Sequence, residues 1–114
     1  MNTTAEIEIA DLQKIDVRIG TILTCENVVN SEKLLKLEVD FGSLGRRQIL
    51  TGMAKFYSAK ELIGLQTAFV VNLKARKMMG LNSFGMVFAI DAGEGKKPVF
   101  LIPKDNVENG CKVL

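Results

Sequence analysis

Apolar and polar residues alternate along much of this chain, which is the pattern of β-strands that bury one face. Between residues 35 and 41 four apolar side chains alternate with three charged ones, which predicts a half-buried strand. Residues 42–45 read as a turn and residues 46–51 as the hairpin partner of that strand. Residues 17–23 are rich in β-branched side chains and predict an earlier strand, with Gly20 as a bulge or bend.

The second half of the chain predicts one short helix and three more strands. The segment Ser58-Ala59-Lys60-Glu61 matches a capping box, and Gly64 is placed to end a helix of about a turn and a half. Strands are predicted over 67–73, 86–90 and 99–102. Shorter elements complete the chain: a helical turn near 10–14 and turns at 30–32, 74–80, 91–95 and 109–110.

Mostly antiparallel strands with one helix after the third strand is the element order of a five-stranded oligonucleotide/oligosaccharide-binding (OB-fold) barrel. We therefore predict an all-β fold in one domain over residues 1–114, with short terminal extensions. The pattern alone leaves a helix-bearing β-sandwich open as the alternative.

Composition is that of one small globular domain. The chain has 114 residues, of which 47% are hydrophobic and 25% charged, so it can build a core without metal or disulfide support. Its apolar runs are too short to span a bilayer, and residues 1–6 lack the pattern of a signal peptide. We therefore expect no membrane association. Cys25 and Cys111 lie in unrelated contexts, so we expect no metal site and a reduced, cytoplasmic chain. We also expect no cofactor.

Positive charge is concentrated in the middle of the chain. Residues 33–77 hold nine basic and three acidic residues, a net charge of +6, whereas the rest holds six basic and ten acidic residues, a net charge of −4. Such asymmetry within one domain predicts a positive face and an anionic partner, although surface solubility alone also produces it.

The strongest local concentration of charge is the turn 74–80. It holds three cations in four residues, and no acid occurs between Glu61 and Asp91. Cations for phosphates, together with amide, hydroxyl and thioether groups nearby for bases and sugars, are what a site for folded or single-stranded RNA requires. The alternative is a solvated basic hairpin.

Enzyme chemistry finds no support in the residues. The chain contains no histidine, so the commonest general base is missing. Neither cysteine has a neighbour that would activate it, and the acidic residues form no recognisable pair. We therefore expect no catalytic residues.

Four motifs occur in one order and at close to one spacing, at residues 15–22, 31–40, 47–54 and 72–86. In these motifs the chain resembles the tRNA-binding domain found at the C-terminus of many bacterial methionyl-tRNA synthetases. The same domain occurs in free-standing bacterial tRNA-binding proteins and in cytokine-related synthetase cofactors of eukaryotes. The resemblance covers about residues 7–113.

The resemblance implies an OB-fold barrel that binds tRNA by shape, works as a homodimer and acts in trans with a synthetase such as methionyl-tRNA synthetase, or on tRNA generally. Two positions depart from the family. Family members often have a proline where Ala75 stands, and many have a polar residue where Phe84 stands. Carried over position by position, the implied RNA contacts are Lys33, Lys36, Arg47, Gln48, Asn72, Lys74, Arg76, Lys77, Ser83 and Met86.

Several of these residues also have simple structural explanations. Lysines on a strand face often only solubilise it, Arg47 follows a turn, Ser83 can shape a turn, and Met86 can begin a core strand. Arg18 is interpreted as structural, paired with Asp16 or a neighbouring strand.

Two other functions stay open. One is the export-chaperone branch of the same family, a dimer that binds unfolded peptides and usually lacks the full Asn-Leu-Lys turn with its following Ser and Met. The other is a dimerisation module that holds a synthetase together. A two-fold interface is predicted from apolar residues in the terminal segments, which alternatively cap the barrel: Ile7, Ile9, Leu12, Phe100, Ile102, Val107 and Val113.

Overall fold

The structure is a computed structural model that describes residues 4–114. Residues 1–3, which belong to the stretch predicted to carry no signal peptide, lie outside the described residues. The elements are α1 (Ile9–Leu12), β1 (Val17–Asn27), β2 (Leu35–Asp40), the 3-10 turn η1 (Gly42–Leu44), β3 (Arg46–Thr51), α2 (Ala59–Leu62), β4 (Gln66–Val70), β5 (Arg76–Met78), β6 (Leu81–Ser83), β7 (Met86–Val87), β8 (Ala89–Ile90) and β9 (Val99–Phe100).

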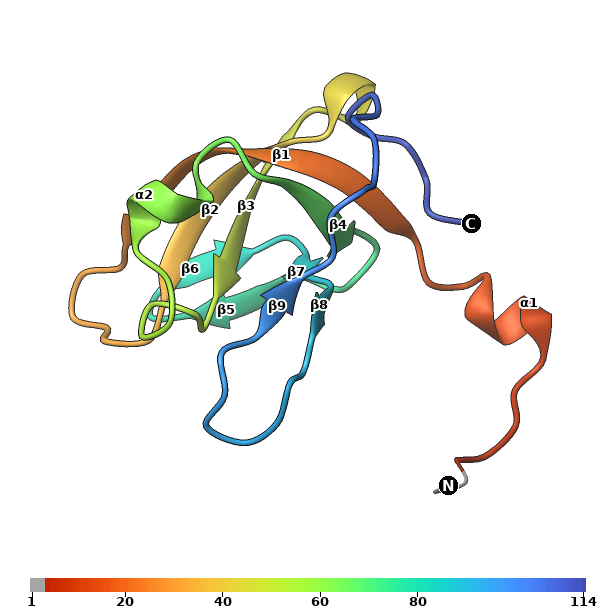
Figure 1. Cartoon of the computed structure of the whole chain (residues 1–114), viewed down its shortest axis with the longest axis horizontal. Coiled ribbons are helices and arrows are strands. Elements are labelled where there is room, and N and C mark those ends of the chain that lie inside the picture. Colours follow the sequence, from red (N-terminus) through yellow and green to blue (C-terminus); the bar gives the residue numbers. More distant parts are fainter. Residues whose placement is uncertain (1–3) are drawn as a thin grey trace.

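A strongly curled antiparallel sheet of five strands forms the body of the molecule, in the order β3-β2-β1-β4-β7 (Figure 1). The predicted all-β OB-fold barrel is confirmed, with the short helix α2 after the third strand. The long strand β1 makes the curl possible because it pairs with β4 through Val17–Thr21 and with β2 through Thr21–Asn27.

The bend of β1 is produced differently from our prediction. The register between β1 and β2 shifts between Ile22 and Thr24, so the bulge lies at Leu23 and not at Gly20. Gly20 is required for another reason: a Cβ there would lie 2.6 Å from Val39 Cγ1 and 2.8 Å from the Phe41 ring. A glycine therefore lets the curled sheet approach its own core.

The core fills the inside of the curl. The rings of Phe41 and Phe69 meet edge-to-face with their centroids 5.4 Å apart. Helix α2 closes one end of the core with the buried Leu62, and its predicted capping box between Ser58 and Glu61 is confirmed. The fully buried apolar side chains are Ile22, Leu35, Leu37, Val39, Phe41, Ile49, Leu62 and Phe69.

The segment predicted as the basic turn 74–80 is instead part of a small separate hairpin. β5 pairs with β6, and the two residues between them, Met79 and Gly80, both have positive φ, at 51° and 78°. Two positive φ values suit the twist of a tight hairpin. The strand predicted over 86–90 is interrupted at Phe88, so that β7 joins the main sheet while β8 pairs with β9.

The two terminal extensions differ. The C-terminal segment runs beside the first half of β1, where Ile19 N–H donates to the Cys111 carbonyl at 2.9 Å and Val113 N–H to the Val17 carbonyl at 2.8 Å. This segment thus covers the free edge of β1, which agrees with the alternative that the terminal segments cap the barrel. Helix α1 projects away from the barrel (Figure 1) and buries none of its residues.

Candidate nucleic-acid interface

Two open grooves lie on either side of β3. The first, of about 300 Å³, lies on the outer face of β1, β2 and β3. The second, of about 450 Å³, lies between the end of β3, the β5–β6 hairpin and the start of β7. We call them the strand groove and the hairpin groove. A third, shallow hollow shares Arg47 with the strand groove and Leu73 with the hairpin groove.

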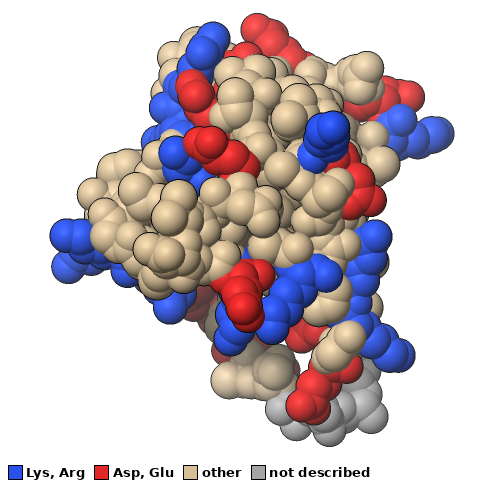
Figure 2. Space-filling model, turned by 90° about the vertical axis from the view of Figure 1, so that its left-hand side faces the viewer, with Lys and Arg blue, Asp and Glu red and all other residues tan. Residues whose placement is uncertain are grey.

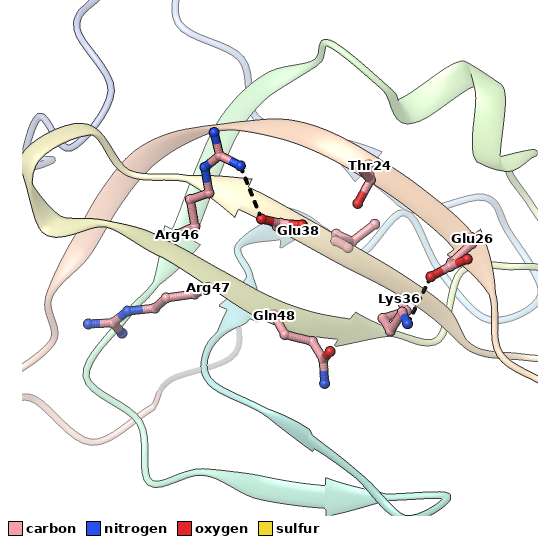
Figure 3. A pocket seen from close by; sticks show the side chains of 8 residues that line it. Thr24, Glu26, Lys36, Glu38, Arg46, Arg47 and Gln48 are labelled. Atoms are coloured by element: carbon pink, nitrogen blue, oxygen red, sulfur yellow. Dashed lines mark hydrogen bonds and ion pairs between the residues drawn. The ribbon is translucent and has the colours of Figure 1, made fainter.

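The strand groove is lined by residues of both charge signs. Its lining is Thr24, Glu26, Lys36, Leu37, Glu38, Arg46, Arg47 and Gln48. Lys36 Nζ lies 2.8 Å from Glu26 Oε1 and Arg46 Nη1 lies 3.5 Å from Glu38 Oε1. Two cations of this face are therefore already paired with carboxylates. Figure 3 shows that Arg47 and Gln48 point away from these two ion pairs.

Arg47 is held at the point where the barrel closes. Its guanidinium donates hydrogen bonds to the backbone carbonyls of Val71 and Phe84. No carboxylate among the described residues pairs with Arg47, so its charge stays available for an anion.

The hairpin groove has a largely apolar lining with cations on it. Lys74 and Arg76 line it, and neither takes part in an ion pair between described residues. Side chains alternate across a strand, so Lys77 leaves β5 on the face opposite to Arg76 and does not line the groove. The other lining residues are Leu50, Thr51, Gly52, Leu73, Met78, Ser83, Gly85, Met86 and Val87.

Besides Arg47, three residues predicted as RNA contacts have polar groups engaged within the protein. Gln48 Nε2 donates to the Asn82 carbonyl at 2.9 Å, which leaves its Oε1 free. Ser83 is 1% exposed, and its hydroxyl accepts from Leu50 N–H and donates to the Gly85 carbonyl. The Asn72 side chain accepts from Asp16 N–H at 2.9 Å and donates to the Lys14 carbonyl at 2.6 Å. In Ser83 and Asn72 an acceptor and a donor are both engaged, so the fold uses these two side chains to position backbone.

The other predicted contacts divide between the grooves and their surroundings. Lys36, Arg47 and Gln48 line the strand groove, and Met86, 48% exposed, lines the hairpin groove. Lys33 is exposed but lines neither groove. Arg18 is structural as predicted, because its Nε lies 2.7 Å from Asp16 Oδ1.

The residues that sequence reasoning missed are mostly apolar. Leu73, Met78 and Gly52 line the hairpin groove, and no sequence signal separates a groove-lining leucine from a core leucine. Arg46 also lines the strand groove. The sequence predicted it only as the first residue of the strand that follows the turn. Figure 2 shows one face of the molecule, on which charged side chains of both signs surround a broad area without charge.

Chemistry beyond binding has few candidate groups. Burial and the neighbouring Glu26 carboxylate raise the pKa of the Cys25 thiol to about 11, so this thiol is a poor nucleophile. Within residues 4–114 no three acidic or cysteine side chains gather as a metal site would need. No helix of that part of the chain has the length and apolar character to cross a membrane.

Comparison with known proteins gives one consistent result. A model of the family described as "Putative tRNA binding domain" matches residues 17–112. The methionine–tRNA ligases of Archaeoglobus fulgidus and Campylobacter jejuni are 43% and 40% identical over 113 and 108 residues. These alignments span 99% and 95% of this chain but only 17% of each ligase.

Solved structures agree with this match over the whole fold. A MetRS-related protein from Pyrococcus horikoshii has a TM-score of 0.90 and 32% identity, over 97% of this chain and 100% of that one. The chaperone CsaA from Bacillus anthracis has a TM-score of 0.86 and 32% identity, over 96% and 100%.

Proposed function

Because this chain belongs to the tRNA-binding domain family, we propose that it is a non-catalytic protein that binds tRNA by its folded shape. The main support for the proposal is that Lys74 and Arg76 line an apolar groove and form no ion pair with a carboxylate of the described residues. Cations that lack a carboxylate partner favour an anion, and an apolar wall beside them favours a base or sugar over a free phosphate.

The contacts divide by chemistry. Phosphates are bound by Lys33, Arg47, Lys74, Arg76 and Lys77. Sugars or bases are contacted by Met86 and by the Oε1 of Gln48, since the Nε2 of Gln48 bonds to the Asn82 carbonyl. Lys36 contributes only after exchanging its carboxylate partner Glu26 for a phosphate. Asn72 and Ser83 act by holding the backbone around the site, because their polar groups bond to the protein itself.

The active form is a homodimer in the cytoplasm, serving tRNA generally or a methionyl-tRNA synthetase in trans. Support comes from the exposed apolar side chains of the N-terminal segment: Ile7, Ile9 and Leu12 are 65%, 72% and 58% exposed. Three such side chains on a projecting segment favour burial against a second copy.

Two other functions remain as candidates with their own support. The likeness to CsaA and the apolar hairpin groove favour binding of unfolded peptides. The similarity to a 17% portion of methionine–tRNA ligases favours a module of a synthetase assembly. The unpaired cations are the reason for preferring RNA to either.

A titration with total tRNA tests the proposal. We expect saturable binding that weakens steeply between about 50 and 200 mM salt, because several phosphates are neutralised. Intact tRNA should outcompete unstructured RNA of equal length, since a reader of shape needs stacked helices. Stronger binding to a reduced, carboxymethylated unfolded protein than to tRNA would favour the chaperone function instead.

A further inference from the structure

The hairpin groove has the size and lining of a site for a flat organic ring. Its volume of about 450 Å³ falls within the roughly 300–1,000 Å³ usual for small-molecule sites. We propose that it receives one unstacked nucleobase of the bound RNA, with the flanking phosphates on Lys74 and Arg76. This inference rests on the proposed RNA-binding function and adds a base-binding site to it.

The walls fit the face of a base. Leu73 and Met86 are about half exposed, at 49% and 48%, and line the groove together with Met78. Thioether groups make favourable contacts with aromatic rings and adapt to their shape. Such walls accept any base, because every base has an apolar face.

The end of β3 supplies groups for the edge of a base. Gly52 lines the groove directly after β3. Neither its amide N–H nor its carbonyl bonds to another residue of the described chain. A free donor and acceptor beside an apolar wall match the mixed donor and acceptor edge of a base.

The cations lie where the phosphates of that nucleotide would run. Arg76 and Met78 occupy alternate positions of β5, so both face the groove. Lys74 precedes the strand on the same side. An apolar peptide would bury the walls equally well but would leave these two charges without a partner, so charge complementarity favours RNA.

Filling the groove is possible without strain. A Cβ on Gly52 would have no heavy atom within 4 Å, and its backbone lies outside the left-handed region. Gly52→Leu therefore adds an apolar side chain at the groove wall and removes no cation. The matched control is Ser43→Leu, which adds the same apolar side chain at an exposed position of η1.

We expect Gly52→Leu to lower affinity for total tRNA by about tenfold, within the range of losing one stacked base. The slope of log K against log salt should stay unchanged, since the phosphate contacts remain. Ser43→Leu should bind like the wild type. If Gly52→Leu folds poorly, Leu73→Ala, which trims an exposed wall residue, should also weaken tRNA binding with an unchanged slope.

A measurement on the wild-type protein gives direct evidence. With ¹³C-methyl-labelled methionine, total tRNA should move the methyl resonances of Met78 and Met86 upfield, because a stacked ring shields them. The buried Met53 should not move. Methyl resonances of the groove that stay in place on a tRNA-saturated protein would overturn the inference.

Other outcomes separate this inference from the proposed function. Wild-type protein that does not bind tRNA would remove both. Gly52→Leu that binds tRNA like the wild type would remove only the base site. A flattened salt slope would mean that the leucine displaced the hairpin cations, and loss of unfolded-protein binding alone would make the groove a peptide site. Either of these results overturns the inference.

Discussion

The hydroxyl of Ser83 accepts a hydrogen bond from the backbone amide of Leu50 across 2.9 Å. It bridges β3 to the end of β6, and the next residue, Phe84, donates its N–H to the Gln48 carbonyl at 2.9 Å. A side chain thus completes a row of backbone hydrogen bonds and closes the barrel beside the hairpin groove.

The Ser83 hydroxyl should stabilise this closure. Ser83→Ala leaves the buried Leu50 amide without an acceptor, so it should lower the free energy of unfolding by about 1–3 kcal/mol. Chemical denaturation measures this, with the exposed Ser43→Ala as a control that should change little. An unchanged free energy of unfolding together with lost tRNA binding would mean that Ser83 contacts RNA directly.

The hairpin cations should contribute according to the face on which they lie. Replacing Lys74 and Arg76 by alanine should flatten the slope of log K against log salt by roughly 2, about 1 for each lost phosphate contact. Lys77→Ala should flatten it less, since Lys77 leaves β5 on the opposite face. Lys104→Ala, at an exposed position near the C-terminus, is the control. An unchanged slope in the double variant would show that Lys74 and Arg76 are only solvated and make no phosphate contact.

Glu26 and Glu38 should limit binding of single strands to the strand groove. They pair with Lys36 and Arg46 on the face that OB-folds commonly offer to single strands. Because both pairs are exposed, Glu26→Gln with Glu38→Gln should strengthen binding of a short single-stranded RNA by only about fivefold, roughly 1 kcal/mol for two pairs. The control, Glu94→Gln with Glu108→Gln, changes net charge equally. An equal gain in both variants would reveal a general charge effect.

The apolar N-terminal segment should join two copies. Light scattering should give twice the chain mass of 12.5 kDa, and Ile9→Asp with Leu12→Asp should reduce both this mass and tRNA affinity. The control Ile63→Asp, at a half-exposed position after α2, should stay dimeric. A wild-type monomer with full tRNA binding would contradict the proposed dimer.

The two cysteines should differ in reactivity. With a pKa of about 11 caused mainly by burial, the Cys25 thiol is about one thousandth ionised at pH 8, whereas Cys111 is exposed. Brief alkylation with iodoacetamide at pH 8 should therefore modify only Cys111 by mass spectrometry. The unfolded protein, as the control, should be modified at both. Equal rates in the folded protein would show that Cys25 is accessible.

Elements with local sequence signals could be predicted before the structure was known. Alternation over residues 35–41 predicted β2, residues 46–51 predicted β3 with its observed bounds, and the Ser58–Glu61 capping box predicted α2. These signals suffice because strand alternation and helix capping depend on neighbours within a few residues. The order of these elements then predicted the barrel, and the concentration of positive charge at residues 74–77 indicated Lys74 and Arg76 as candidate contacts.

The roles of the polar side chains at the site depend on contacts between residues that are distant in sequence. Ser83 lies 33 residues from Leu50 and Asn72 lies 56 residues from Asp16, so no local pattern indicates that their side chains are engaged. The bulge at Leu23 and the apolar lining of the hairpin groove likewise follow from how the sheet curls and closes. A hydrogen bond or a groove wall made by residues distant in sequence exists only once the chain has brought them together, and this is why the fold was readable in advance and the details of its site were not.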